Sequence, residues 1–471
     1  MPPEHLRFGG GAAESVLTPL VALWLLIAIC VIWTRPRNRA ITPFLLAFFT
    51  IPMNQVLVIG GFHFTALRVL ILASLGRTMM PNDGKERRFS GGVNRIDIMV
   101  VLWSIWAVIA LYLQFPETQA LINGVGALID TLGAYFVVRY FVSDREALAR
   151  TIAALAVVSV TLGICMINEQ VTHINVFGLL AGGSGAATVR DGHVRAGATL
   201  GPLYGGAFAG VLLPEFLWLW STKQFRWKAV AGIFGATAMV VTSYSSTSWM
   251  AFMGGAVGLA FWPLRRRMRL VRWGLVIILF GLQIVMKAPV WALISRIDLT
   301  GSSSSYQRYM LMDMTIRTFS KWWLIGTPDY VNWGWDSWDL CNQFVAVALT
   351  GGLFTLIFYV AMFKRSFGAI GKARTRRAGD RKEEWSLWCL GSALFATVVA
   401  HFGINYAAQL IMGLSVLIAC ISVATQEPKQ AMRIAGLPLS PVEPLATSAE
   451  PVFAHRTITA TEICSATERR L

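Results

Sequence analysis

The chain has 471 residues, of which 55% are hydrophobic and 14% charged, with a mean hydropathy of +0.57. This balance excludes an ordinary soluble protein and predicts a polytopic membrane protein. The formal net charge of +16 would suggest nucleic-acid binding in a soluble chain, but basic loops beside an anionic leaflet explain it here, so we expect no nucleic-acid partner.

The predicted fold class is all-α, a polytopic bundle of transmembrane helices, because the apolar runs approach the roughly 20 residues that a spanning helix needs. The first run lacks a signal-peptide cleavage pattern and is followed by Arg35, Arg37 and Arg39, so we expect it to remain as a span. In all we predict about 12–13 spans, near 16–33, 41–59, 62–76, 96–114, 121–138, 151–167, 203–220, 228–242, 247–263, 272–288, 341–363, 386–403 and 406–424.

Charge sorts the loops between two sides of the membrane. Lys and Arg gather at 35–39, 77–95, 139–150, 223–228, 265–272 and 364–382, whereas the loops near 60, 116, 168–202, 243–246, 289–340 and 404 alternate with them. Positive loops stay in the cytoplasm, so we predict an outer N-terminus and a cytoplasmic C-terminus. Residues 1–425 should form the membrane domain and 426–471, richer in Pro, Ser, Thr and charge, a disordered cytoplasmic tail.

The long outer loop 289–340 is nearly neutral and contains a predicted helix from Ser304 to Phe319. Apolar residues recur there at intervals of three and four, which predicts an amphipathic helix lying on the bilayer with one membrane-facing stripe. The stripe consists of Tyr309, Met312, Ile316 and Phe319, with Trp322 and Trp323 following at interface depth.

Arg195 is the first candidate for chemistry, since it stands beside Gly197 and Gly201 at the mouth of the span beginning near 203. A guanidinium next to glycines, which let a backbone approach closely, suits a phosphate. The alternative is an interfacial arginine that anchors to lipid head groups. His193, on the same loop, is either a base or a solvated side chain.

Further candidates lie in the outer helix and where its loop re-enters the membrane. The Arg308 guanidinium could bind phosphate oxygens through paired hydrogen bonds, whereas we expect Arg317 to lie on the solvated polar face of the helix. Asp339 is either a general base or the N-cap of a helix starting at about Leu340. The small polar run from Thr242 to Ser248 either lines a polar cavity or, as we favour, satisfies backbone groups at a tight turn.

Motifs of other chemistries do not occur in the sequence. There is no P-loop, no GxSxG elbow and no HExxH pair, and we find no internal repeat. The six cysteines show no CxxC or metal spacing, so we expect neither a disulfide nor a zinc site.

One order of features is distinctive along the second half of the chain. It runs as follows: Arg195-x-Gly197, Pro202 at the start of a span, the small-polar break from Ser243 to Ser248, Arg308 in an outer helix, Trp323-Leu-Ile-Gly326-Thr327, Asp339 with Asn342, and Gly351-Gly352-Leu353. In this order the chain resembles the O-antigen ligase and polymerase superfamily of bacterial envelope proteins, especially members from exopolysaccharide clusters. The resemblance covers roughly 195–363.

The resemblance implies a metal-independent glycosyltransferase of the membrane C-type fold, without a cofactor. Such enzymes transfer a glycan from an undecaprenyl-diphosphate-linked oligosaccharide to a hydroxyl at the outer face of the bacterial inner (cytoplasmic) membrane. Other partners would be membrane lipid and envelope-polysaccharide assembly proteins. Arg195 and Arg308 match the arginines that hold the donor diphosphate, with Asp339 as the candidate base. The full set of candidate substrate-binding residues is Arg195, Arg308, Arg317, Tyr306, Asn342, His193 and Asp336.

One departure favours polymerase over ligase. Ligases of the superfamily carry a His before the Asn of the re-entering loop, where this chain has Cys341, and polymerase-like relatives carry an Asp at about the position of Asp339. The alternative function is a polysaccharide or lipid-linked glycan flippase without covalent chemistry. Flippases and transporters usually have repeats and mid-membrane charges, for which Arg68 and Glu215 are the main candidates here.

Overall fold

The computed structural model describes residues 15–80, 88–190, 192–296, 304–334, 337–407 and 409–426. It is 74% helix with few strands, in agreement with the predicted all-α class. The chain divides between Gln426 and Glu427, and the predicted tail beyond this point lies outside the described residues.

Six helical segments of the described part are long and apolar enough to cross a membrane, which indicates a multi-pass membrane protein. They are α4 (Arg95–Gln114), the run of α5 (Thr118–Leu128), η3 (Ile129–Gly133) and α6 (Ala134–Phe141), α7 (Arg145–Thr172), α9 (Pro202–Ser221), α12 (Met268–Val285) and α15 (Gln343–Arg376). The remaining bundle helices are shorter or more polar: α1 (Pro19–Thr34), α2 (Ile41–Thr50), α3 (Ala66–Met79), α10 (Arg226–Thr242), α11 (Ser246–Ala260), α16 (Arg381–His401) and α17 (Gln409–Ala424).

The predicted spans 41–59 and 62–76 are wrong where they adjoin. Helix α2 ends at Thr50, and the chain then forms an antiparallel hairpin of β1 (Val56–Ile59) and β2 (Phe62–Thr65). Gly60 and Gly61 turn the hairpin with positive φ values of 58° and 83°, a conformation that costs glycine little. The Thr65 side chain then caps α3. An apolar run rich in β-branched and aromatic residues fits a strand as well as a span.

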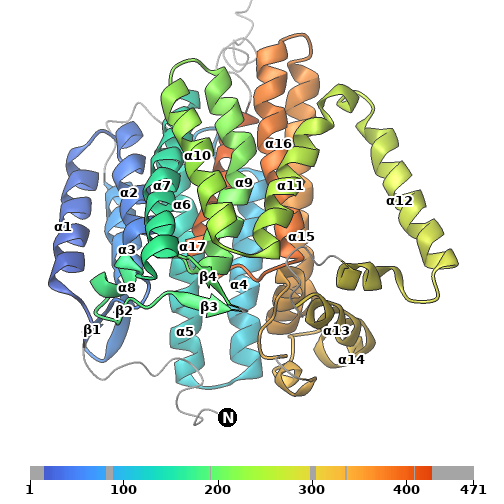
Figure 1. Cartoon of the computed structure of the whole chain (residues 1–471), viewed down its shortest axis with the longest axis horizontal. Coiled ribbons are helices and arrows are strands. Elements are labelled where there is room, and N and C mark those ends of the chain that lie inside the picture. The colour runs from blue at the N-terminus through green and yellow to red at the C-terminus, as the bar shows by residue number, and fades with distance from the viewer. Residues whose placement is uncertain are drawn as a thin grey trace, which may run out of the picture. The chain divides into compact units, whose positions relative to one another are not determined.

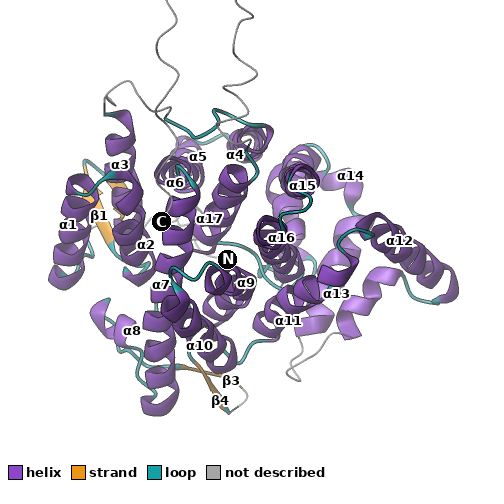
Figure 2. Cartoon of the chain, turned by 90° about the horizontal axis from the view of Figure 1, so that it is seen from above, coloured by secondary structure: helices purple, strands orange, loops and turns teal. Residues whose placement is uncertain are grey.

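Helix α9 contacts α7, α10, α11 and α16 within the bundle (Figure 1, Figure 2). Helices α7 and α10 approach closely because glycines face each other. A Cβ on Gly163 would lie 2.8 Å from the Gly235 carbonyl oxygen, and a Cβ on Gly235 would lie 2.6 Å from the Ser159 carbonyl oxygen. Small residues at the contact are how transmembrane helices pack without a hydrophobic driving force.

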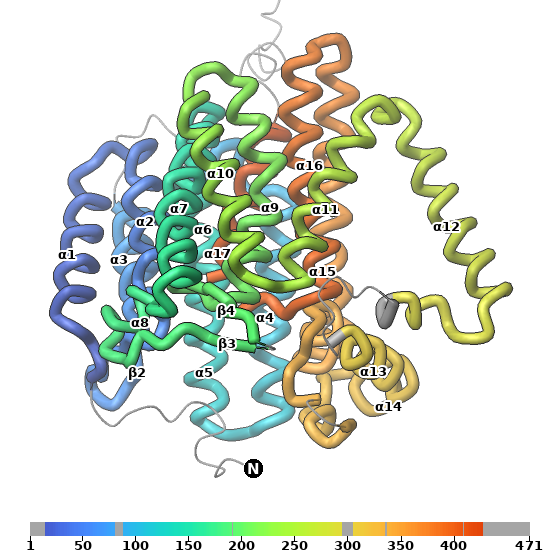
Figure 3. The backbone as a smooth tube through the Cα atoms, in the orientation of Figure 1, coloured from blue at the N-terminus to red at the C-terminus, as the bar shows by residue number. Residues whose placement is uncertain are grey.

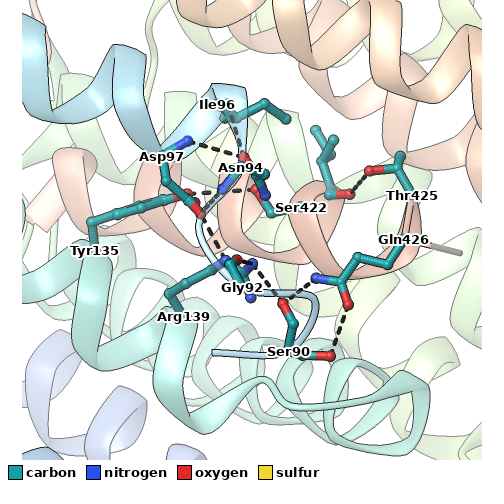
Figure 4. A network of polar contacts seen from close by, with 11 residues as sticks. Ser90, Gly92, Asn94, Ile96, Asp97, Tyr135, Arg139, Ser422, Thr425 and Gln426 are labelled. Carbon is teal, nitrogen blue, oxygen red and sulfur yellow. Dashed lines mark hydrogen bonds and ion pairs between the residues drawn. The ribbon is translucent and has the colours of Figure 1, made fainter. Parts of the chain in front are cut away.

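A buried polar network joins the segment before α4 to α6 (Figure 4). Asn94 and Asp97 form a capping box at the start of α4. Tyr135 donates to Asp97 Oδ1 over 2.5 Å, and Arg139 Nε lies 3.4 Å from the same oxygen. Arg139 Nη2 also donates to the Ser90 carbonyl over 2.9 Å. The buried carboxylate is therefore paired and hydrogen-bonded, which such a charge requires.

Helix α12 runs at the periphery of the bundle (Figure 3), and none of its residues is buried. It is apolar, and an exposed apolar helix of this length suits contact with lipid. The 3-10 segment η5 (Val290–Arg296) follows it.

The elements that carry the candidate residues gather at one end of the bundle, where α9 and α11 begin (Figure 1). They include β4 (His193–Arg195) and α13 (Ser304–Arg317), with β3 (Thr188–Arg190) and α14 (Phe319–Trp322) next to them in the chain. The α9–α10 and α15–α16 turns lie at the opposite end (Figure 1). Which end faces the cytoplasm stays a prediction.

Candidate functional site

Both arginines that the sequence singles out donate hydrogen bonds to residues 243–248, which link α10 to α11 and include the start of α11; we call this segment the α10–α11 turn. Arg195 Nε donates to the Ser243 carbonyl over 3.4 Å, and Arg308 Nη2 donates to Thr247 Oγ1 over 3.2 Å. The two guanidiniums thus reach positions only four residues apart on one turn, although they are distant in sequence. The interpretation of this polar run as mere backbone satisfaction was incomplete, because the Thr247 hydroxyl contacts a cationic side chain.

Two glycines make room for this turn. A Cβ on Gly206 of α9 would lie 2.0 Å from Ser248 Oγ, and a Cβ on Gly403 would lie 2.7 Å from Thr247 Oγ1. Thr247 Oγ1 also donates to the Gly403 carbonyl over 3.0 Å. The turn is therefore held between α9 and the segment that follows α16, and the hydroxyl of Thr247 links that segment to Arg308.

Arg195 ends strand β4, which pairs antiparallel with β3. The loop that follows is fixed by Glu169, a buried carboxylate near the end of α7. Its Oε2 accepts from Gly197 N over 3.0 Å and from Ala198 N over 2.9 Å. Ala198 has a φ of 47°, an uncommon conformation for alanine that these hydrogen bonds support. Glu169 could not be identified from the sequence, because a single carboxylate near the end of a predicted span does not indicate a hydrogen-bond partner 28 residues later.

Arg308 belongs to the inward face of α13, where it is 4% exposed. The same face buries Leu311 and Thr315, and Leu311 joins a cluster with Trp322 and Leu349.

The apolar stripe predicted for α13 lies off the face that the protein buries, and its contact with the bilayer stays a prediction. Ile316 and Phe319 are exposed while Tyr309 and Met312 are half-buried, and the helix ends at Arg317 rather than Phe319. The face that the protein buries carries Arg308, which a hydropathy pattern assigns to solvent; tertiary contact with the α10–α11 turn outweighs that preference.

The other arginine of α13 does not reach the turn in the described structure. Arg317 is exposed and pairs with Asp313 one helical turn earlier, Nε to Oδ2 at 2.6 Å. The hydrogen bond that Arg317 donates to Asp313 raises the pKa of this guanidinium. This geometry agrees with the favoured interpretation of a solvated polar face. Tyr306 is likewise exposed, and Asp336 lies outside the described residues.

Asn342, and not Asp339, caps the helix that re-enters the membrane. Helix α15 begins at Gln343, three positions later than predicted, and Asn342 Oδ1 accepts from Phe344 N (2.9 Å) and Val345 N (3.3 Å). The capping alternative for Asp339 is therefore wrong. Asn342 is fully buried, and its Nδ2 makes no hydrogen bond within the part of the chain that the structure describes. That amide is a buried donor with an unused hydrogen-bonding capacity.

Asp339 stands next to the Arg308 region. Its carbonyl accepts from Gln307 Nε2 over 3.2 Å, which ties it to the residue preceding Arg308. Burial raises the pKa of the Cys341 thiol to about 12; the Asp339 carboxylate adds to this and the Arg308 guanidinium opposes it. All three groups thus share one electrostatic environment. The thiol is neutral at physiological pH and is no general base there.

Tyr204 and Asn405 add a hydrogen-bonded pair that the sequence analysis assigned no role. The Tyr204 hydroxyl donates to Asn405 Oδ1 over 3.2 Å, and both side chains are half-buried. The Tyr204 hydroxyl is within the electrostatic reach of Asp339 and Cys341. Only the tertiary arrangement could identify this pair, which joins α9 to a loop 201 positions away.

Two glycines, Gly326 and Gly352, help to position the beginning of α15. Helix α15 is broken at Gly352 (φ 76°), and Gly326 (φ 90°) lies against the break. The backbone of 323–327 pairs with it, from Thr327 N to the Leu349 carbonyl (2.8 Å) and from Leu353 N to the Trp323 carbonyl (2.8 Å). The first turns of α15, which Asn342 caps, are thereby held against the loop after α14.

Among the described residues, no group of three or more His, Cys, Asp or Glu side chains could hold a metal ion. The five cysteines of the described part are unpaired, and Cys464 lies outside it. No protein-family model and no curated protein matches this sequence.

Proposed function

We propose that this chain is a membrane glycosyltransferase. It would polymerise polysaccharide repeat units from an undecaprenyl-diphosphate-linked donor at the outer face of the bacterial inner membrane. The observation that carries the proposal is the approach of Arg195 and Arg308 to one turn, with the backbone carbonyl of Asp339 hydrogen-bonded to Gln307, the neighbour of Arg308. The motif order that resembles the O-antigen ligase and polymerase superfamily supports the same assignment.

The two arginines would hold the donor diphosphate. Guanidiniums keep their charge at any working pH and match phosphate oxygens in a forked geometry. The burial of Arg308 strengthens such an interaction because water competes less for the charge. As the glycosyl–oxygen bond breaks, negative charge grows on the departing diphosphate, and positioned cations stabilise it.

Asp339 would accept the proton of the attacking hydroxyl. The acceptor oxygen forms a bond to the anomeric carbon, the bond from that carbon to the diphosphate oxygen breaks, and the hydroxyl proton moves to the carboxylate. Asn342 Nδ2, buried and without a hydrogen-bond partner among the described residues, would orient one of the substrates by donating a hydrogen bond. Since Cys341 is neutral, the carboxylate is the better base, which favours a polymerase over a ligase.

One observation favours the alternative of a glycan flippase without covalent chemistry. Glu215 of α9 is buried, and its Oε2 has no hydrogen-bond partner among the described residues. It lines a small cavity of about 20 Å³, room for about one water molecule, together with Thr397 and Tyr406. An ionisable residue inside a membrane bundle is a candidate for transport.

Reconstitution separates the two functions. The full chain in proteoliposomes receives an undecaprenyl-diphosphate-linked oligosaccharide on the side that carries α13, and products are resolved by length. A polymerase yields a ladder of longer lipid-linked glycans with release of undecaprenyl diphosphate. Movement of unchanged donor across the bilayer, with no longer product, would instead support the flippase.

A further inference from the structure

A stacked pair of aromatic side chains lies at the edge of the α10–α11 turn. The rings of His193 and Tyr244 are 4.4 Å apart between centroids and inclined by only 15°. Both residues are exposed, with Tyr244 at 44%. Tyr244 is the one exposed residue of 243–248, since its neighbours in the turn are buried. A flat aromatic surface is therefore presented to the outside from an otherwise enclosed turn.

The pair adjoins the guanidinium of Arg195. His193 and Arg195 are separated by one residue in β4, so their side chains leave the same face of the hairpin. Val194 between them is buried on the other face. Arg195 donates to the carbonyl of Ser243, the residue before Tyr244. The aromatic pair and the cation are thus neighbours on two elements that meet at this turn.

The backbone of Tyr244 is unfavourable for its residue type. Its φ is 47°, in the left-handed region where an L-residue with a bulky side chain is strained and glycine is not. A turn selected only for stability would favour glycine or asparagine at this position. Strained residues cluster at binding and catalytic sites, where the side chain itself is needed.

We infer that His193 and Tyr244 form a saccharide-binding platform beside the diphosphate site, a subsite for a sugar ring of the lipid-linked glycan. A pyranose has a face of C–H groups that packs on an aromatic surface, while the phenol and imidazole supply polar edges for its hydroxyls. Arg195 next to the platform would hold the phosphate to which the sugar is attached. This inference rests on the proposed function, because it takes Arg195 as a phosphate ligand.

The test uses the full chain in detergent and two probes measured separately. Saturation-transfer NMR reports contact with ring protons in a panel of sugar 1-phosphates (glucose, galactose, mannose and N-acetylglucosamine). Phosphorus line broadening reports binding of inorganic pyrophosphate. In the unaltered chain we expect ring-proton signals from at least one sugar phosphate, and broadening of pyrophosphate.

Tyr244→Gly is the decisive variant, because glycine relieves the backbone strain while removing the ring. We expect thermal stability to be unchanged or higher, the ring-proton signal to fall roughly fivefold or more, and pyrophosphate broadening to persist. Tyr244→Phe should retain the sugar signal. The matched control is Phe62→Ala in the β1–β2 hairpin, an exposed aromatic that is 51% accessible, which should change neither probe.

The outcomes separate this inference from the proposed function. Undiminished sugar signals in Tyr244→Gly, or no sugar signal from any member of the panel in the unaltered chain, would overturn the platform. If the unaltered chain causes no line broadening of pyrophosphate, the proposed diphosphate site is contradicted instead.

Discussion

The guanidinium of Arg308 donates a hydrogen bond to Thr247 Oγ1 over 3.2 Å, and the same hydroxyl donates to the Gly403 carbonyl. One threonine side chain therefore joins α13, the start of α11 and the segment that follows α16. The orientation of a cation proposed to bind diphosphate depends on this hydroxyl.

Thr247→Val keeps the shape of the side chain but removes both hydrogen bonds. Leaving a buried guanidinium hydrogen unpaired costs about 1–3 kcal/mol, so we expect transfer activity to fall roughly 10-fold or more, with pyrophosphate affinity falling in parallel. Thr247→Ser should restore both. Thr151→Val is the matched control, since the buried Thr151 hydroxyl bonds only within its own helix. Equal activity of the two Val variants would argue against a positioning role.

Arg308→Lys and Arg317→Lys form a matched pair within α13. Lysine keeps the charge but loses the forked geometry, so we expect the buried Arg308 variant to lose activity about 10²-fold by analogy with other removed transition-state donors. The exposed Arg317 variant should retain it, because an exposed ion pair one helical turn apart contributes little. Initial rates with the lipid-linked donor check this, and similar losses in both variants would contradict it.

Asp339→Asn removes the proposed base without removing a helix cap, since Asn342 caps α15. We expect a loss of 10²-fold or more in transfer rate, with unchanged thermal stability. Asp329→Asn, in the same outer loop and exposed, should be close to unaltered. Near-normal polymer length in cells that carry the Asp339 variant at normal protein level would show that another group acts as the base.

Gly352→Ala should disrupt the break in α15. A Cβ there would lie 2.4 Å from the Leu324 carbonyl oxygen, and the φ of 76° is strained for alanine. We expect destabilisation of about 1–3 kcal/mol, the usual cost of a residue held in a disfavoured backbone region.

Gly368→Ala, further along the same helix, is the control. A Cβ at this position meets nothing within 4 Å, so alanine should stabilise the helix by about 0.5–1 kcal/mol. Thermal unfolding in detergent measures both variants, and a stable Gly352→Ala protein would show that the break is dispensable.

The distribution of charged loops predicts the orientation of the protein in the membrane. We expect Asn332→Cys, in the outer loop, to react with an impermeant maleimide added to intact cells, and Ala378→Cys, in the basic turn after α15, to react only after permeabilisation. Both positions are exposed in the structure. The reverse labelling pattern would invert the assignment of the outer face and with it the proposed location of the reaction.

The sequence by itself determined the class of protein, the positions of most helices and the residues worth testing. Length of apolar runs and clustering of Lys and Arg are local properties, and the bilayer imposes them directly on each segment. These local properties did not predict the hairpin at 56–65, where an apolar run forms two strands. They also did not identify which residue caps α15, because a cap depends on where the helix begins.

Only the tertiary structure decided which of the candidates meet. Arg195 and Arg308 reach the α10–α11 turn across 48 and 61 residues of sequence, and no local pattern records such contacts. The same holds for the inward face of α13 and for the stacking of His193 on Tyr244. These features arise because helix packing and small residues such as Gly206 set which side chains face one another, after the hydrophobic pattern has already been satisfied.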